Sequence, residues 1–337
     1  MKKILVTGAS GYIAKHIILQ LLQAGYSVRG SVRAQNKEAE IRDAMTAALG
    51  ADPAERLEFV HLDLNQDTGW NDALAGMDGL FHTASPFVIE EPKDHDILIR
   101  PAVDGTLRAL GAAKSAGVSR VILTSSVAAI LGTDKRPGQA HLDEQDWSDV
   151  NSPLTGVYNK SKTLAERAAW DYAQANNIDL TTINPCMVLG APVGKSFGAS
   201  LSVIERILSG KDPAVPFSGL AVVHVKDVAL AHIRAFENDA SIGERIIAAN
   251  EFFWFKELSG ILKQTFPSRK IPTRQAPNWL IKLLAKFDKS LAVIIPHLGR
   301  DSSISNAKAQ KLLGIKFISG KETIIESGRF LVDEMGK

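Results

Sequence analysis

Near the N-terminus the chain reads Lys3-Ile4-Leu5-Val6-Thr7-Gly8-Ala9-Ser10-Gly11-Tyr12-Ile13-Ala14. The apolar run before the first glycine predicts a short buried strand, and apolar residues at helical spacing predict a helix over residues 11–24. Gly8, Gly11 and Ala14 then form a Gly-x-x-Gly-x-x-Ala turn between the two. An ordinary strand–helix turn is the alternative. Because a strand is predicted before the turn and a helix after it, we favour the interpretation that free N–H groups of the turn bind a pyrophosphate.

Further short β-rich runs follow, separated by stretches of helical length. They cover residues 27–32, 57–62, 79–83, 120–125 and 180–184, with a late strand at 245–249 after a helical segment at 225–236. Such alternation is typical of βαβ units and a parallel sheet. The sequence therefore predicts an α/β fold: a Rossmann-type doubly wound parallel sheet with a smaller mixed C-terminal substrate lobe.

The texture of the chain changes after residue 185, where Gly, Pro, Ser and Lys become frequent at 190–197 and 210–219. Segments of this composition are typical of loops over a site. We expect residues 1–185 to form the dinucleotide-binding domain, with a returning segment at about 222–250. Residues 186–221 and 251–337 are then the substrate-binding lobe.

Composition excludes several classes of protein. The 45% hydrophobic and 23% charged residues are those of an ordinary globular chain. A net charge of +2, from 39 basic and 37 acidic residues, gives no case for a nucleic-acid partner. No apolar run is long enough for a membrane span or a signal peptide, so we expect a cytoplasmic protein. One cysteine and eight scattered histidines predict neither a disulfide nor a metal site. Monomer and homodimer both remain open.

Arg33 ends the second predicted strand, which contains no carboxylate. Sites for NAD usually place Asp or Glu there, about 20 residues beyond the glycine turn, to bind the ribose 2′-hydroxyl. A guanidinium instead suits a 2′-phosphate through paired, charge-assisted hydrogen bonds, and Lys37 lies close enough to help. Both could be solvated surface residues. The missing acid and the present base together predict NADP (NADPH) as cofactor.

Two further strand ends carry candidate cofactor contacts. Asp63-Leu64 follows the third strand and Thr83-Ala84-Ser85 follows the fourth. Both fall where the adenine and ribose of a dinucleotide would pass the carboxyl ends of strands. Either could be plain loop sequence, so each supports the interpretation only together with the glycine turn.

Tyr158 and Lys162 stand in the run Tyr-Asn-Lys-Ser-Lys. Positions four apart share one face of a helix, and an adjacent ammonium lowers the pKa of a tyrosine. We therefore expect a proton donor or acceptor that works near neutral pH. Ser126, in Thr124-Ser125-Ser126 at the end of the fifth strand, offers a hydroxyl to a substrate oxygen. Tyr-x-x-x-Lys is most often a surface pair. Carbonyl reduction is favoured only because the glycine turn, the Thr-Ser-Ser strand end and the Tyr-x-x-x-Lys helix follow one another in this order along the chain.

With these motifs the chain resembles the extended short-chain dehydrogenases/reductases, in the branch of dihydroflavonol reductases, cinnamoyl-type reductases and microbial aldehyde/ketone reductases. The resemblance covers nearly the whole length. Besides the two motifs it rests on Phe81-His82-Thr83-Ala84-Ser85-Pro86, Pro101-Ala102-Val103-Asp104-Gly105-Thr106, Ser161-Lys162-Thr163-Leu164-Ala165-Glu166, Asn184-Pro185 with Val188 and Gly190, and His224-Val225-Lys226-Asp227-Val228-Ala229.

The resemblance implies that Ser126, Tyr158 and Lys162 are the catalytic set, and that Pro185–Val188 and Ser200 help to hold NADP. The predicted cofactor-binding residues are then Gly8, Ser10, Gly11, Tyr12, Ile13, Arg33, Lys37, Asp63, Leu64, Thr83, Ala84, Ser85, Thr124, Tyr158, Lys162, Pro185, Val188 and Ser200. The predicted substrate contacts are Phe87, Ser126 and Met187.

Two departures from the family pattern bear on chemistry and substrate. Many members carry an asparagine in the stretch matched by Ala102-Val103 as part of a proton relay, so here a water or the ribose must carry that relay. In dihydroflavonol reductases an asparagine five residues after the catalytic serine contacts the flavonoid. Leu131 takes that place here, after apolar residues 127–130. A polyhydroxylated flavonoid would lose hydrogen bonds there, and an apolar aldehyde or ketone would not.

The sequence thus predicts an NADPH-dependent reductase of a medium-sized aldehyde or ketone, with Tyr158 as proton donor. A dihydroflavonol or cinnamoyl-type reductase is one alternative. A sugar-nucleotide epimerase or dehydratase is another, although such enzymes usually keep an acid where Arg33 stands. A non-catalytic NADP sensor is the third, although sensors of this fold typically lose the tyrosine or the lysine. His224 and Cys186 are expected to have packing roles.

Overall fold

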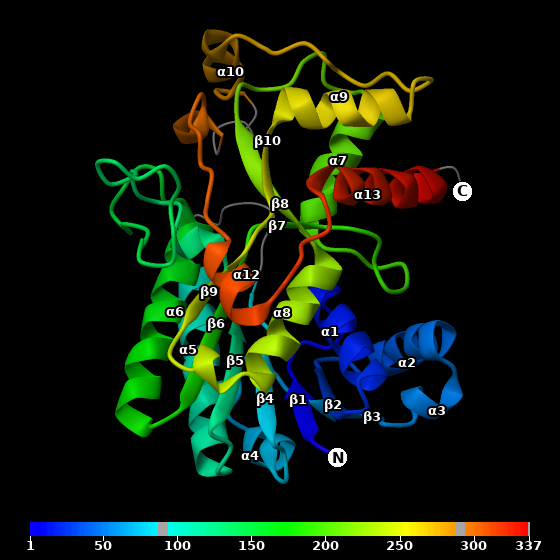
Figure 1. Ribbon diagram of the computed structural model, residues 1–337, viewed down its shortest axis with the longest axis vertical. Helices are drawn as coiled ribbons and strands as arrows, with labels where there is room; N and C mark the ends of the chain where they lie inside the picture. The colour runs from blue at the N-terminus through cyan, green and yellow to red at the C-terminus, as the bar shows by residue number, and fades with distance from the viewer. Residues whose placement is uncertain (87–93, 288–293, 336–337) are drawn as a thin grey trace.

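The computed structural model describes residues 1–86, 94–287 and 294–335. Within these residues a seven-stranded sheet runs in the order β3-β2-β1-β4-β5-β6-β9, with every neighbouring pair parallel (Figure 1). The strands are β1 (Lys3–Val6), β2 (Ser27–Val32), β3 (Leu57–His61), β4 (Gly79–His82), β5 (Arg120–Thr124), β6 (Asp179–Pro185) and β9 (Arg245–Ala248). This order, reversing between β1 and β4, confirms the predicted Rossmann-type sheet.

Successive strand residues feed two separate cores, one on each face of the sheet. In β5, Val121 and Leu123 join the core on one face, while Ile122 joins the core on the other. Leu80 and Phe81 of β4 divide in the same way. Side chains of a strand alternate in direction, so a sheet covered on both faces needs a continuous apolar run. The central strands β1, β4 and β5 are largely apolar runs of this kind, whereas β2 also contains Ser27, Arg29 and Ser31.

Helices cover both faces of the large sheet (Figure 1). On one face α5 packs against α6, and on the other α1 packs against α8. The helices of the described residues are α1 (Tyr12–Gln23), α2 (Asn36–Leu49), α3 (Ala51–Ala54), α4 (Trp70–Leu74), α5 (Asp96–Ser115), α6 (Val157–Asn176), α7 (Ala199–Ser209), α8 (Val225–Glu237), α9 (Phe255–Thr265), α10 (Asn278–Leu284), α12 (Ala307–Leu313) and α13 (Gly320–Met335), with 3-10 turns η1 (Val127–Ala129), η2 (Asp239–Ser241) and η3 (Ile295–His297).

A second, smaller sheet has the order β10-β8-β7 and lies beyond the carboxyl ends of the large sheet (Figure 1). Its strands are β7 (Met187–Leu189), β8 (Gly219–His224) and β10 (Glu251–Trp254). β7 and β8 are parallel, and β10 is antiparallel to β8. This mixed sheet, with α7, α9 and α13 packed on and around it, is the smaller mixed part that the fold prediction included.

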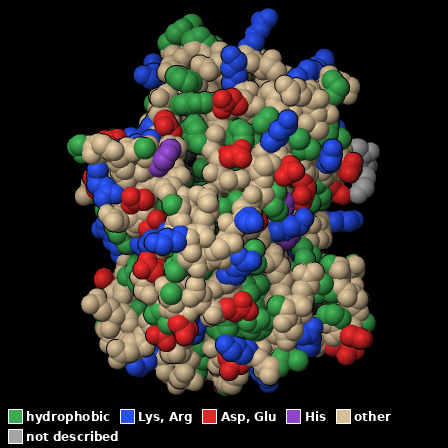
Figure 2. All heavy atoms as spheres, in the orientation of Figure 1, with side chains coloured by type: hydrophobic (Ala, Val, Ile, Leu, Met, Phe, Trp, Pro, Cys, Tyr) green, Lys and Arg blue, Asp and Glu red, His purple; other side chains and the backbone are tan. Residues whose placement is uncertain are grey.

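Charged side chains of both signs are interspersed over the face shown in Figure 2, with hydrophobic side chains at its upper end near α10. Trp279, Leu283 and Leu284 of α10 are exposed, as is Phe287 just beyond it. None of the helices in the described ranges is both long and apolar enough to cross a membrane.

Candidate active site

The turn between β1 and α1 has a backbone that only glycine adopts easily. Gly8 has a φ of +67°, and a Cβ built there would lie 3.1 Å from the Cα and Cβ of Ala84. The N–H of Gly8 donates to Oγ of Ser31 at 3.0 Å, and the N–H of Ala9 donates to the Ser31 carbonyl at 2.8 Å. The turn is therefore fixed to the end of β2 and lies close against the segment that follows β4.

A pocket of about 430 Å³ opens at this turn, at the carboxyl ends of β1 to β4. Its lining includes nine of the predicted cofactor residues: Gly8, Ser10, Gly11, Arg33, Asp63, Leu64, Thr83, Ala84 and Ser85. Ligands of open α/β sheets bind outside the carboxyl ends of the strands, where the strand order reverses. A close-approach glycine, the start of α1 and an arginine in the lining together fit a dinucleotide.

The buried side chain of Thr7 holds the segment after β4, which lines this pocket. Its Oγ1 accepts the N–H groups of Thr83 at 3.0 Å and Ala84 at 3.1 Å, and it contacts Nδ1 of His82 at 2.9 Å. Burial lowers the pKa of His82 to about 3. This imidazole therefore stays neutral at physiological pH and orients the Thr7 hydroxyl instead of exchanging protons with substrate.

Replacing Gly8 by alanine should weaken dinucleotide binding. A left-handed backbone costs an L-residue about 1–2 kcal/mol, and the new Cβ must also displace Ala84. Gly76→Ala is a matched control, because Gly76 has a φ of +72° with nothing within 4 Å of the added Cβ. Thermal unfolding should show a loss of stability in both variants, whereas a fluorescence titration with NADPH should show lost affinity in Gly8→Ala alone. Equal affinities in the two variants would contradict the placement of the pyrophosphate.

Other predicted cofactor residues lie outside the pocket lining. The Tyr12 hydroxyl donates to the Gly190 carbonyl at 2.7 Å, which ties α1 to the segment after β7, and Ile13 packs against the core. Lys37 pairs with Glu40 at 2.7 Å, whereas Arg33 is exposed. Arg33 is thus better placed than Lys37 to bind a 2′-phosphate. Lys37 would first have to break its ion pair with Glu40.

Four of the remaining predicted cofactor residues lie at the end of β5, at the end of β6, in β7 and in α7. Thr124 Oγ1 contacts Nε2 of the buried His232 at 2.7 Å, which fixes the end of β5. Pro185 ends β6, Val188 is buried in β7, and Ser200 lies in the first turn of α7. Met187 of β7 is half-buried. Phe87 lies outside the described residues.

The structure brings Ser126, Tyr158 and Lys162 together. Ser126 follows β5 immediately, and its Oγ accepts the N–H of Ala128 at 3.1 Å. Tyr158 and Lys162 lie in the first two turns of α6, one helical turn apart. The side chains of Tyr158 and Ser126 are hydrogen-bonded to each other. Two hydroxyls and an ammonium thus face the end of β5, beside the strand ends that line the pocket.

Burial shifts the pKa values of Tyr158 and Lys162. It raises the pKa of Tyr158, and the hydrogen bond to Ser126 lowers that pKa only in part. The expectation that Lys162 makes the phenol unusually acidic is therefore wrong for this structure, because loss of hydration disfavours the phenolate more strongly. Burial also lowers the pKa of Lys162 to about 8, against the opposing effect of Glu166. Near neutral pH the pair is a protonated phenol beside an ammonium, which suits proton donation.

His224 and Cys186, for which packing roles are expected, are both buried. His224 is fully buried at the start of α8, where its ring accepts the N–H of Lys226 at 3.1 Å and contacts Glu326 at 3.1 Å. Burial raises the pKa of the Cys186 thiol, and a thiol in this state is a poor nucleophile.

Several residues of the site were not predicted. Ser31, Asn65, Trp70 and Pro101 line the pocket, and Glu166 lies beneath Lys162. Ser31 carried a local signal, because it lies in the strand whose end was examined for the cofactor. Glu166 also carried one, since it lies four residues after Lys162 on the same helix. Trp70 and Pro101 reach the pocket only through the packing of α4 and α5.

The fold and the pocket define a dinucleotide-binding protein of the doubly wound class. A family model described as the NAD dependent epimerase/dehydratase family matches residues 4–249. Cinnamoyl-CoA reductase 1 of Arabidopsis thaliana is 36% identical over 337 residues, which cover 99% of this chain and 90% of that protein. Cinnamoyl-CoA reductase CAD2 of Medicago truncatula is 37% identical over 277 residues, 81% of this chain and 83% of that protein.

Solved structures agree with this likeness. Yeast methylglyoxal/isovaleraldehyde reductase Gre2, complexed with NADPH, matches with a TM-score of 0.80 at 29% identity and covers 99% of each chain. The present chain belongs to the NAD dependent epimerase/dehydratase family, that is, to the extended short-chain dehydrogenases/reductases. Within that family it is an NAD(P)-dependent oxidoreductase of the branch that contains cinnamoyl-CoA reductases, dihydroflavonol 4-reductase and Gre2. The resemblance predicted from the motifs is confirmed.

Proposed function

We propose that this protein is an NADPH-dependent reductase that converts aldehydes or ketones into alcohols. The observation that carries the proposal is the meeting of Tyr158, Ser126 and Lys162 at the end of β5, beside a pocket rimmed by Arg33. Residues 1–185 with a returning segment at about 222–250 would hold the cofactor. Residues 186–221 and 251–337 would hold the substrate.

Each side chain has a role that its position allows. The Ser126 hydroxyl and the phenol of Tyr158 would bind the carbonyl oxygen, and Tyr158 would give its proton to the oxygen as negative charge develops there. Lys162 would stabilise the phenolate that remains and bind the ribose next to the nicotinamide. A bound nicotinamide dinucleotide supplies the hydride. The arginine at the end of β2, where NAD sites usually have an acid, supports NADPH over NADH.

The apolar segment that follows Ser126 supports an apolar substrate. Val127, Ala128, Ala129 and Ile130 are buried, and Leu131 packs against the same core. A polar substrate group facing them would lose its hydrogen bonds to water without replacement. The relatives include reductases named for cinnamoyl-CoA and for dihydroflavonol, so a thioester and a flavonoid belong among the compounds tested.

A substrate panel tests the proposal. Purified protein is mixed with NADPH and with aliphatic, aromatic and α-dicarbonyl compounds, a cinnamoyl thioester, a dihydroflavonol and a nucleotide sugar. The readouts are NADPH absorbance and chiral analysis of the product. We expect the fastest consumption of NADPH with an apolar aldehyde or ketone. Binding of NADPH without turnover of any compound would favour the sensor alternative. Turnover of the nucleotide sugar with retained NAD would favour an epimerase.

A further inference from the structure

A buried carboxylate lies directly below the catalytic lysine. Glu166 follows Tyr158 and Lys162 at intervals of four residues on α6, so the three side chains share one face of the helix. Its exposure is 1%. A carboxylate this deeply buried is expected to be paired and fully hydrogen-bonded, because its hydration has been lost. The proposed roles of Ser126, Tyr158 and Lys162 leave this group unused.

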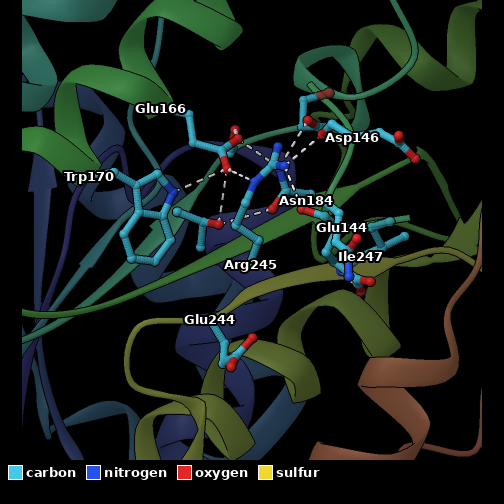
Figure 3. A network of polar contacts seen from close by, with 12 residues as sticks. Glu144, Asp146, Glu166, Trp170, Asn184, Glu244, Arg245 and Ile247 are labelled. Carbon is cyan, nitrogen blue, oxygen red and sulfur yellow. Dashed lines mark hydrogen bonds and ion pairs between the residues drawn. The ribbon is translucent and has the colours of Figure 1, made fainter. Parts of the chain in front are cut away.

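Donors from β9, from β6, from the residue after β5 and from α6 surround the Glu166 carboxylate (Figure 3). Arg245 of β9 donates from Nε at 2.6 Å. Asn184 of β6 donates from Nδ2 at 2.7 Å, and the hydroxyl of Ser125, just after β5, donates to the same oxygen as Asn184. Thr182 and Trp170 add longer contacts at 3.2 and 3.4 Å. Each of these bonds is donated to the carboxylate, as an ionised acid requires.

Arg245 is itself locked in place, so the Glu166 carboxylate has one position. The guanidinium is 8% exposed and lies over the ring of Trp147, 3.7 Å from its centroid. Its Nη1 donates to the carbonyls of Glu144 at 2.8 Å and Asp146 at 2.7 Å. Breaking a buried pair of this kind leaves an uncompensated charge.

The same network reaches both sides of the proposed catalytic group. Asn184 Nδ2 donates to the Ser126 carbonyl at 3.2 Å as well as to Glu166, and Ser125 precedes Ser126 in the chain. On the other side, Glu166 and Lys162 line one small cavity of about 10 Å³, together with Ser125 and with Thr106 of α5. Glu166 thus connects the backbone of Ser126 to the surroundings of the Lys162 ammonium.

The charges around Lys162 come from few groups. Glu166 of its own helix favours the charged form of Lys162. His82 of β4 is near enough for the Lys162 ammonium to lower the pKa of its ring, and that ring is neutral near pH 7. The cavity lining contributed by α5 is the uncharged Thr106, and Tyr158 is a protonated neighbour on the same face of α6. Among the described residues no carboxylate pairs directly with Lys162 within 4.0 Å, so Glu166 is the negative charge that offsets its burial.

We propose that Glu166, held by Arg245, is a positioning residue of the proposed reaction that keeps Lys162 charged beside Tyr158 and fixes the backbone of Ser126. The proposal rests on the proposed function for its catalytic meaning. Its electrostatic part concerns the protein alone and is measurable without cofactor or substrate.

The test is a titration of Lys162 in the Glu166→Gln variant. Protein carrying ¹³C-labelled lysine is titrated by heteronuclear NMR, and the Lys162 signal is assigned by its absence in Lys162→Met. Burial then acts on Lys162 without the opposing carboxylate, so its pKa should fall below the present value of about 8. Neighbouring opposite charges shift a pKa by about 1–3 units. The alkaline limb of the kcat/KM profile should move to lower pH by the same amount.

Two further variants make the result specific. Glu144→Gln removes another buried carboxylate of this network, one that accepts the N–H of Ile247 at 3.1 Å. This variant should be less stable, but the pKa of its Lys162 should be unchanged. Arg245→Gln leaves the negative charge of Glu166 uncompensated, so it should raise the pKa of Lys162. This variant tests the proposal by a shift in the opposite direction if Glu166→Gln does not fold.

An unmoved Lys162 titration in Glu166→Gln, or an equal movement in Glu144→Gln, would overturn the proposal. Where Glu166→Gln does not fold, a fall or no change in the pKa of Lys162 in Arg245→Gln would overturn it as well. Failure of the proposed function is distinguishable, because a protein that reduces no carbonyl would still give the NMR result.

Discussion

Replacing Tyr158 by phenylalanine should reduce kcat for carbonyl reduction by about a thousandfold, within the 10²–10⁴ range of general acid catalysis. The ring remains and only the hydroxyl that is bonded to Ser126 is lost, so the affinity for NADPH should stay the same. The measurements are steady-state rates with the best compound of the panel and a fluorescence titration with NADPH. The combination of lost turnover and retained binding is the signature of a missing proton donor.

Tyr172→Phe is the matched control for this variant. Tyr172 lies on the same helix, α6, and packs against the core on the α5 side of the sheet. Its hydroxyl has no place in the proposed reaction, so kcat should not change. Reductase activity that survives in Tyr158→Phe would remove the phenol from the mechanism. Unchanged biological function in that variant would favour a sensor.

Replacing Arg33 by aspartate should reverse the preference between the two dinucleotides. The guanidinium lies at the rim of the pocket at the end of β2, where a charge-assisted hydrogen bond contributes about 1.5–3 kcal/mol. Its loss corresponds to about 10- to 150-fold weaker NADPH binding, at 1.4 kcal/mol for each factor of ten. The new carboxylate would also repel a 2′-phosphate and accept the 2′-hydroxyl of NADH.

The control for that change carries the same alteration of net charge elsewhere. Arg329 is exposed on α13, so Arg329→Asp should leave both affinities in place. Dissociation constants for NADPH and NADH are compared at one ionic strength, because salt weakens exposed charge interactions. Equal loss for both cofactors in Arg33→Asp would mean that Arg33 supports the pocket without recognising the phosphate.

The short sequence patterns determined the large sheet, since its strands are short β-rich runs separated by stretches of helical length. Segments such as 27–32 and 120–125 contain the information for their own conformation, and the structure places β2 and β5 there. The smaller sheet did not follow from pattern. β7 has three residues, and it is held by pairing Met187 with Val222, far along the chain. A strand this short, which is held by pairing with a distant segment, shows no clear alternation of apolar and polar residues in its own sequence.

The sequence by itself also determined part of the candidate site, namely nine residues of the pocket lining and the pairing of Ser126 with Tyr158. The glycine turn, the arginine after β2 and the Tyr-x-x-x-Lys spacing are local features of strands and helices whose ends the parallel sheet brings to one edge. The tertiary structure alone decided their charge states. Burial raised the pKa of Tyr158 where spacing had indicated a lower one. Arg245, 79 residues from Glu166, fixed the carboxylate beneath Lys162. Hydration and long-range charge depend on what surrounds a side chain in space, and one-dimensional spacing carries no record of that.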